Sequence, residues 1–383
     1  MLLGANITAA ALGFAVRISI ANLVSVEEFG RFTYCIALGT FGTFLVSFGF
    51  EKTVVREFVQ HPDNRGRYLA ASLIIRLALF AIFLFSLIVW KLLSVDVSWV
   101  MVGIVLAYAS MALSLDGVFD SWHRMGIHGV LFALQKVLFA GIVFFMISIS
   151  PSYAGIMLIC VALTSSMFLF LLAQYRYVWP KVDFNNCFHQ IGNYSIRILH
   201  ENWPIYLSII VYSGYRFLAQ AVLEQSAGMT ELGIYGASWQ IASIGIIFYM
   251  QVARIGYPLV AAVAGAGVSR AEKSYAIIKY TFVLSVIVLP VCVTLFIVPE
   301  SILSLVFKPE YVSGASILRL FAILLIILAY GEIAQQYLIS VKEIRFYLVS
   351  RIAGCIVGSG LCFILIPIWE GDGAAIALCL GAL

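Results

Sequence analysis

Long apolar runs follow one another along this chain, each bounded by charged or turn-forming residues. A helix that crosses a bilayer needs about 20 predominantly apolar residues. The runs that meet or approach this length are 3–24, 32–50, 69–90, 99–115, 130–149, 153–173, 204–223, 234–264, 280–299, 317–341 and 346–368. A further run begins at Gly373 and stops at Leu383, so we expect a twelfth helix that is truncated.

The composition of the chain excludes the other structural classes. Of its 383 residues, 63% are hydrophobic and only 11% are charged. A soluble domain has about 45–50% apolar and about 25% charged residues. We therefore expect an all-α polytopic membrane protein with about 12 transmembrane helices, and not a soluble, disordered, collagen-like or coiled-coil chain.

Motifs for metals, cofactors and nucleotides are absent from the sequence. The seven cysteines show no C-x-x-C spacing, and most lie in apolar runs, where Cys usually packs as a small hydrophobe. No G-x-x-x-x-G-K-[ST] motif is present, and His200-Glu201 does not continue into H-E-x-x-H. The net charge of +4 comes without a basic tail. We expect no metal, no cofactor, no nucleotide-driven pump and no nucleic-acid partner.

Lys and Arg residues are distributed unequally between alternate loops. The loops after the second, fourth, sixth, eighth and tenth runs hold 13 of them, whereas the other loops hold only Arg31, Lys91 and Lys308. Cytoplasmic loops of membrane proteins carry an excess of Lys and Arg. This pattern predicts that the first set of loops and the N-terminus face the cytoplasm.

A short motif recurs at the same topological place in each half of the chain. Glu28-Phe29-Gly30-Arg31-Phe32 follows the first run, and Glu231-Leu232-Gly233-Ile234-Tyr235 follows the seventh, at an offset of 203 residues. The longest loop on the expected cytoplasmic side, 174–203, separates the sixth and seventh runs. We therefore expect two six-helix lobes related by a parallel repeat, at 1–185 and 186–383.

Seven Lys and Arg residues lie inside the apolar runs, where we find a single acid, Glu332. A charge at the centre of a membrane helix costs about 2.5–3.5 kcal/mol on insertion scales. Arg319 and Arg351 lie close enough to helix ends to extend to the interface. The others predict a water-filled cationic cavity between two lobes that binds an anionic substrate, with contacts to helix ends or lipid phosphates as the alternative. These candidates are Arg17, Arg76, Lys136, Arg216 and Arg254.

Polar side chains at helical spacing extend the candidate binding site. They form one stripe of Gln240, Ser243, Gln251 and Arg254 and another of Ser213, Arg216 and Gln220. We include Gln240 and Gln251 in the substrate-binding set, although such stripes can also only join helices. Glu332 is the candidate for proton or sodium coupling, and an ion pair with a nearby Arg is the alternative.

Turn motifs of the chain resemble those of one transporter family. They are Val26-Glu27-Glu28-Phe29-Gly30-Arg31-Phe32, then Gly49-Phe50-Glu51 with Val55-Arg56-Glu57, and Ile366-Pro367 followed by Gly371-Asp372-Gly373-Ala374-Ala375-Ile376-Ala377. Through these motifs the chain resembles the Wzx-type O-antigen and exopolysaccharide flippases. These are polysaccharide biosynthesis transporters of the multidrug/oligosaccharidyl-lipid/polysaccharide exporter superfamily.

The resemblance implies a V-shaped protein of two six-helix lobes that works by alternating access. Its substrate would be an oligosaccharide repeat unit on undecaprenyl pyrophosphate, carried from the cytoplasmic to the periplasmic leaflet of the bacterial inner membrane. Arg suits the pyrophosphate because its planar fork donates in pairs. The implied partners are membrane lipids, a polysaccharide polymerase and a chain-length regulator. Many relatives carry an Asp shortly after a basic residue in the seventh helix, but Phe217-Leu218 follow Arg216 here, so no coupling role transfers.

Two other classes compete with this hypothesis. A multidrug-extruder-type antiporter of the same superfamily would need buried carboxylates for cationic drugs, whereas the apolar runs hold mainly bases. A polytopic polysaccharide polymerase or glycosyltransferase usually places its catalytic residues on a long outward loop. The longest such loop, 300–316, holds only Glu300 and Glu310 as acids. We therefore predict a transporter and not an enzyme.

Overall fold

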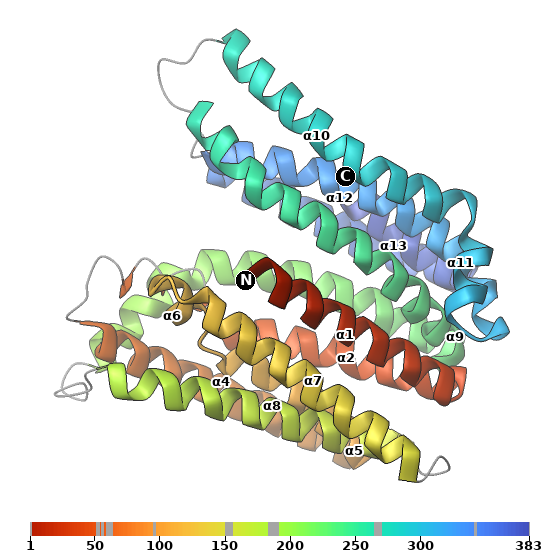
Figure 1. Cartoon of the computed structure of the whole chain (residues 1–383), viewed down its shortest axis with the longest axis horizontal. Helices are drawn as coiled ribbons and strands as arrows, with labels where there is room; N and C mark the ends of the chain where they lie inside the picture. The colour runs from red at the N-terminus through yellow and green to blue at the C-terminus, as the bar shows by residue number, and fades with distance from the viewer. Residues whose placement is uncertain are drawn as a thin grey trace. The chain divides into compact units, whose positions relative to one another are not determined.

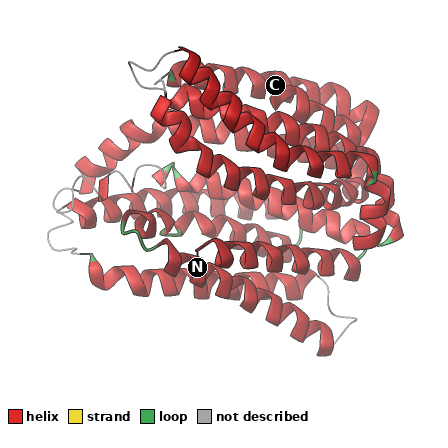
Figure 2. Cartoon of the chain, turned by 45° about the horizontal axis from the view of Figure 1, so that its top comes forward, coloured by secondary structure: helices red, strands yellow, loops and turns green. Residues whose placement is uncertain are grey.

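The computed structural model describes residues 2–50, 54, 57–58, 64–94, 97–149, 156–182, 191–263, 270–340 and 343–382. Within these ranges some helix side chains lie outside the description, those of Gln251 and Arg254 among them. The described residues form helices joined by short connections, and none of them forms a strand (Figure 2). The predicted all-α architecture is confirmed.

Helices make up almost the whole described chain (Figure 1). In chain order they are α1 (Leu2–Leu23), α2 (Val26–Ser47), α4 (Arg65–Leu93), α5 (Trp99–Ala109), α6 (Asp116–Ser121), α7 (Met125–Ile149), α8 (Ile156–Val178), α9 (Ile191–Val263), α10 (Arg270–Ile297), α11 (Pro299–Val306), α12 (Ala315–Ser340) and α13 (Ile344–Ala382). Short 3₁₀ turns lie at Ser110–Leu113, Trp179–Lys181 and Pro309–Gly314.

Among the described residues, eight helices are long and apolar enough to cross a membrane. A ninth crossing results if the bent pair Ile191–Trp203 and Tyr206–Ile246 is one span. The described residues of the spans expected from the sequence lie almost entirely in helices. Some neighbouring expected spans share one helix in the structure. Helix α9 contains the seventh and eighth expected spans, and α13 contains the last two.

Three expected connections are shorter than the sequence predicted. The chain between the seventh and eighth spans is helical except at Gly228, and the chain before the last span is helical except at Glu370. Both residues have left-handed backbones, with φ of 85° and 47°, and only glycine adopts that region without cost. The expected loop 174–203 was too long, since α8 runs to Val178 and α9 begins at Ile191. Glu and Gln are good helix formers, so polarity alone did not end these helices.

By its internal contacts the chain divides into two compact units. Unit 1 consists of Met1–Val24 and Tyr34–Ser213, and unit 2 consists of Ser25–Thr33 and Gly214–Leu383. The start of α2 therefore belongs to unit 2, and the start of α9 belongs to unit 1. The division into repeated lobes at 1–185 and 186–383 stays a prediction.

Unit 1 is held together by helix packing and an aromatic core. Helix α7 packs between α1 and α8 (Figure 1). In the core of the unit the rings of Phe50 and Tyr68 stack at 5.8 Å between centroids, and those of Phe119 and Tyr177 stack at 5.4 Å. Offset ring pairs of this kind stabilise a core beyond the area they bury.

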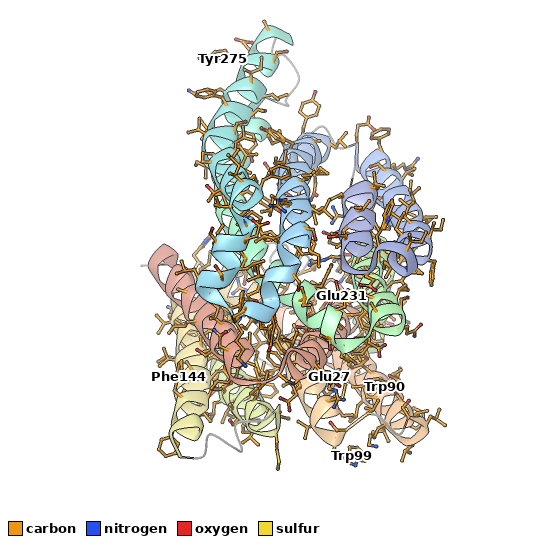
Figure 3. All side chains as sticks on the ribbon, turned by 90° about the vertical axis from the view of Figure 1, so that its right-hand side faces the viewer. Glu27, Trp90, Trp99, Phe144, Glu231 and Tyr275 are labelled. Carbon is orange, nitrogen blue, oxygen red and sulfur yellow. The ribbon has the colours of Figure 1, made fainter. Side chains whose placement is uncertain are left out.

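Unit 2 contains the contact between the two copies of the repeated motif. Helix α2 opens with a capping box, in which Ser25 Oγ accepts from the Glu28 N–H and the Glu28 carboxylate accepts from the Ser25 N–H, both at 3.2 Å. The helix then crosses α9 just after Gly228. Figure 3 labels Glu27, which directly precedes the first copy, and Glu231, which is the first residue of the second copy.

Two glycines bring the backbones of these copies together. A Cβ built on Gly30 would lie 1.8 Å from the carbonyl oxygen of Met229, and one built on Gly233 would lie 2.3 Å from that of Val26. Gly30 and Gly233 are related by the 203-residue offset, and so are Val26 and Met229. The contact is therefore reciprocal, as expected for equivalent segments that meet across a local two-fold axis. This geometry supports the predicted repeat.

Candidate functional site

Among the candidate cations whose side chains are described, Arg216 is the one that the structure leaves most available. The chain folds back at Gly228 (Figure 1), which places Arg216 beside Trp239 with its Cζ 4.6 Å from the centroid of the indole ring. A guanidinium over an indole face is held by a cation–π attraction. In the described part of the chain, Arg216 forms neither a hydrogen bond nor an ion pair. Its planar set of N–H donors can therefore bind an anion.

Aromatic packing fixes the support on which Arg216 rests. The Trp239 ring meets Phe321 of α12 edge-on at 5.1 Å, and the Tyr235 ring meets the same phenylalanine at 5.2 Å. Tyr235 and Phe321 are 2% and 0% exposed. Arg216 is thus positioned by rings that are themselves locked in the core of unit 2.

Two amide side chains accompany Arg216 on α9. Gln220 lies one helical turn further along the same face, and its Oε1 is buried without a hydrogen-bond partner among the described residues. Gln240 directly follows Trp239 and is 6% exposed. Gln251 and Arg254 belong to the same helix, but their side chains lie outside the described residues.

Arg17 and Lys136 lie together in unit 1. Helices α1 and α7 pack side by side, so that the Cδ of Lys136 lies 3.8 Å from a Cβ built on Gly13. The two cations are close enough to interact electrostatically, and the Lys136 Nζ lies 5.0 Å from the centroid of the Phe132 ring. Two neighbouring like charges on apolar helices form a second place that favours an anion.

Arg76 has a different environment from Arg216. It is 1% exposed on α4, and its Nη1 donates to the carbonyl oxygens of Ala112 and Ser114 at 2.9 and 3.0 Å. These carbonyls lie where the helix breaks between the 3₁₀ turn and α6, and a helix end leaves carbonyls without intrahelical donors. The Phe50 ring covers the guanidinium, with 4.2 Å from its centroid to Cζ. This geometry matches the alternative expectation of a contact to a helix end.

We expect Arg76→Met to destabilise the protein by about 2 kcal/mol, because buried carbonyls lose their donor at about 1–3 kcal/mol for each unsatisfied group. The measurement is the thermal unfolding midpoint of the purified protein in detergent. Transport per folded molecule should stay close to that of the wild type. Loss of transport at unchanged stability would instead assign Arg76 to the substrate.

Glu332 forms part of a polar network in unit 2. The Gln336 amide donates to the Glu332 carboxylate at 3.2 Å, and the Tyr280 hydroxyl of α10 donates to Gln336 at 3.3 Å. Among the described residues no Arg pairs with Glu332, and the nearby Arg351 donates to Gln335 at 3.4 Å. The network leaves the carboxylate with an amide donor and no countercharge from the described residues.

Arg319 is paired at the end of its helix. Its guanidinium donates to the Glu300 carboxylate at 2.6 Å and to the carbonyl of Phe296 at 3.2 Å. The pKa of Glu300 lies below its usual range because its own backbone N–H and the Arg319 guanidinium both donate to the carboxylate. Arg319 therefore has a structural partner and is not a free cation.

The structure also brings together two polar residues, His128 and Asp116, that sequence reasoning missed. The His128 Nε2 of α7 lies 2.8 Å from the Asp116 carboxylate, which also accepts from the Ser114 hydroxyl and, at 3.2 Å, from the Gln174 amide. Asp116 lies within the apolar helical segment Trp99–Ser121, one residue beyond the expected run 99–115. In the sequence Asp116 directly follows the apolar run 99–115, so it was counted as a loop residue.

These features define a polytopic helical membrane protein with cations on apolar spans, and the solved structures that it resembles are transporters. A multidrug resistance MATE family transporter of the MOP superfamily, inward-facing, matches with a TM-score of 0.72 at 17% identity, over 98% of this chain and 91% of that one. The lipid II flippase MurJ, inward closed, matches with a TM-score of 0.71 at 12% identity, over 100% and 84%. A MOP superfamily transporter from Pyrococcus furiosus matches with a TM-score of 0.59 at 16% identity, over 100% and 92%.

The family follows from the sequence match. Residues 1–264 match the model of the polysaccharide biosynthesis protein family, and the chain therefore belongs to that family. No curated protein matches the chain. The predicted family and the prediction of a transporter rather than an enzyme are confirmed.

Proposed function

We propose that the protein is a flippase for oligosaccharide repeat units linked to undecaprenyl pyrophosphate. It moves them by alternating access from the cytoplasmic to the periplasmic leaflet of the bacterial inner membrane, with its N-terminus in the cytoplasm. The repeat units serve O-antigen or exopolysaccharide synthesis. The family membership supports a role in polysaccharide biosynthesis, and the fold shared with the lipid II flippase MurJ is compatible with a lipid-linked cargo.

The observation that carries the proposal is the state of Arg216. Its guanidinium is stacked on Trp239 and forms no hydrogen bond or ion pair with the described residues. Charge inside a membrane span is costly and is retained where it has a partner or a substrate. A pyrophosphate offers the bidentate oxygen acceptors that match the Arg fork.

The remaining candidates take secondary roles in this proposal. Arg17 and Lys136 attract the anionic cargo in unit 1, and Gln240 contributes beside Trp239. Gln251 and Arg254 remain predicted members of the substrate-binding set. Glu332 remains the candidate for ion coupling. The polysaccharide polymerase and the chain-length regulator remain the predicted protein partners.

Deletion of the gene tests the proposal. We expect lipid-linked repeat units to accumulate on the cytoplasmic side and surface polymer to be absent, because a charged headgroup does not cross the bilayer unaided. The measurements are surface polymer by immunoblot and lipid-linked intermediates by mass spectrometry of extracts. Wild-type protein expressed from a plasmid should restore the polymer. Normal surface polysaccharide in the deletion strain would overturn the proposal.

A further inference from the structure

We propose that Gln220 recognises the sugar next to the pyrophosphate, so that the site distinguishes a glycosylated carrier lipid from the bare one. The inference rests on the proposed function and deepens it. Arg216 and Gln220 are one turn apart on the same face of α9, about 6 Å along the helix axis at 1.5 Å per residue. A group that contacts both side chains therefore has the size of one phosphate and its adjoining sugar.

The two side chains require different chemistry. Arg216 is a pure donor, and its available N–H groups need an anion. The Gln220 Oε1 is a buried acceptor without a partner among the described residues, and such an atom costs free energy until a donor reaches it. Bare pyrophosphate at neutral pH offers mainly acceptors, so it satisfies Arg216 but leaves Gln220 unsatisfied.

A sugar hydroxyl supplies the missing partner. A hydroxyl both donates and accepts, so it pairs with the Gln220 amide whichever way the amide is turned. The last side-chain torsion of Gln is broad, so the amide can turn to present either its oxygen or its NH₂ group to that hydroxyl. A carrier lipid with its first sugar thus fills both sites, whereas undecaprenyl pyrophosphate alone fills one.

Alternative ligands fit the pair less well. A cationic drug is repelled by Arg216, and a neutral sugar leaves the guanidinium without its anion. An anionic lipid such as phosphatidylglycerol carries phosphate and hydroxyls but not a sugar ring fixed beside the phosphate. The combination of an Arg with an unsatisfied amide one turn away favours a glycosyl phosphate.

The test compares two probes on the purified full chain in nanodiscs. One probe is the lipid-linked repeat unit extracted from the deletion strain, and the other is undecaprenyl pyrophosphate. We expect the wild-type protein to bind the glycosylated probe about tenfold more tightly, which is the effect of roughly one hydrogen bond to a buried group. Gln220→Leu should weaken the glycosylated probe about tenfold and leave the bare probe within twofold, whereas Arg216→Ala should weaken both.

The control is Gln225→Leu, because Gln225 is exposed further along the same helix and should leave both affinities unchanged. Equal affinity of the wild-type protein for the two probes would overturn the inference even if Gln220→Leu fails to fold. Gln220→Leu that weakens both probes equally, or neither, would also overturn it. If the wild-type protein binds neither probe, the proposed function fails as well, which separates the two failures.

Discussion

Gly30→Ala is expected to destabilise the folded protein by more than about 3 kcal/mol. A methyl group on Gly30 would lie 1.8 Å from the carbonyl oxygen of Met229 and 3.1 Å from the backbone nitrogen of Gly233. The clashing atoms belong to a helix backbone, so no side chain can rotate away and the two helices must separate. Overpacking a core costs about 1–3 kcal/mol and occasionally more, and backbone clashes lie at the upper end. The measurement is the thermal unfolding midpoint in detergent.

Symmetry provides a second variant and a matched control. Gly233→Ala should have a similar effect, since its methyl group would lie 2.3 Å from the carbonyl oxygen of Val26. Gly141→Ala in α7 should leave the midpoint unchanged or raise it, because no atom lies within 4 Å of the added Cβ and alanine is the better helix former. If Gly30→Ala unfolds at the same temperature as Gly141→Ala, the close contact of the two motifs is wrong.

The positions of the spans could be predicted from sequence because lipid imposes a simple rule on length and polarity. The connections could not be predicted with the same success. Residues such as Glu224 and Gln225 are polar, but they continue a helix as well as leucine does. The chain turns only at Gly228, where the backbone is left-handed. The chain contains 30 glycines, and no sequence feature marks Gly228 as the one at which the helix turns.

The candidate site shows the same limit. Sequence reasoning identified Arg76 and Arg216 together, because both lie within apolar runs and both are costly there. Their difference comes from tertiary structure. A break before α6 exposes carbonyls that bind Arg76, whereas the turn at Gly228 places an indole ring beside Arg216, which forms no hydrogen bond with the described residues. Neither the break nor the turn has a strong sequence signature, so residue type and depth could not separate the two roles.

The repeated motif marks a tertiary contact that the sequence did not predict. Its two copies were found by a match of Glu, an apolar residue, Gly and an aromatic residue at one offset. The structure adds that the glycines of both copies meet each other. Glycine is required there because the backbones approach too closely for any side chain. The repeat predicted equivalent positions in the two halves, but it did not predict that these positions touch.

Arg216→Ala is expected to reduce surface polymer at least tenfold in the complemented deletion strain, with protein level and unfolding temperature preserved. Hydrogen bonds to charged groups contribute about 1.5–3 kcal/mol, and each 1.4 kcal/mol is a factor of ten. Arg216→Lys should give an intermediate level, because lysine keeps the charge but lacks the planar fork. The change should not unfold the protein, since Arg216 has no hydrogen bond to lose among the described residues.

Arg319→Ala is the matched control for this loss. Like Arg216, Arg319 is an arginine on an apolar helix of unit 2. Its guanidinium is occupied by Glu300, so surface polymer in Arg319→Ala should stay within about twofold of the wild-type level. If Arg216 binds the substrate, the two alanine variants should differ in surface polymer, because of these two arginines only Arg216 has unpaired donors. If both alanine variants export equally well, the cation on Trp239 is a packing feature, and the anion must bind at Arg17 and Lys136 instead.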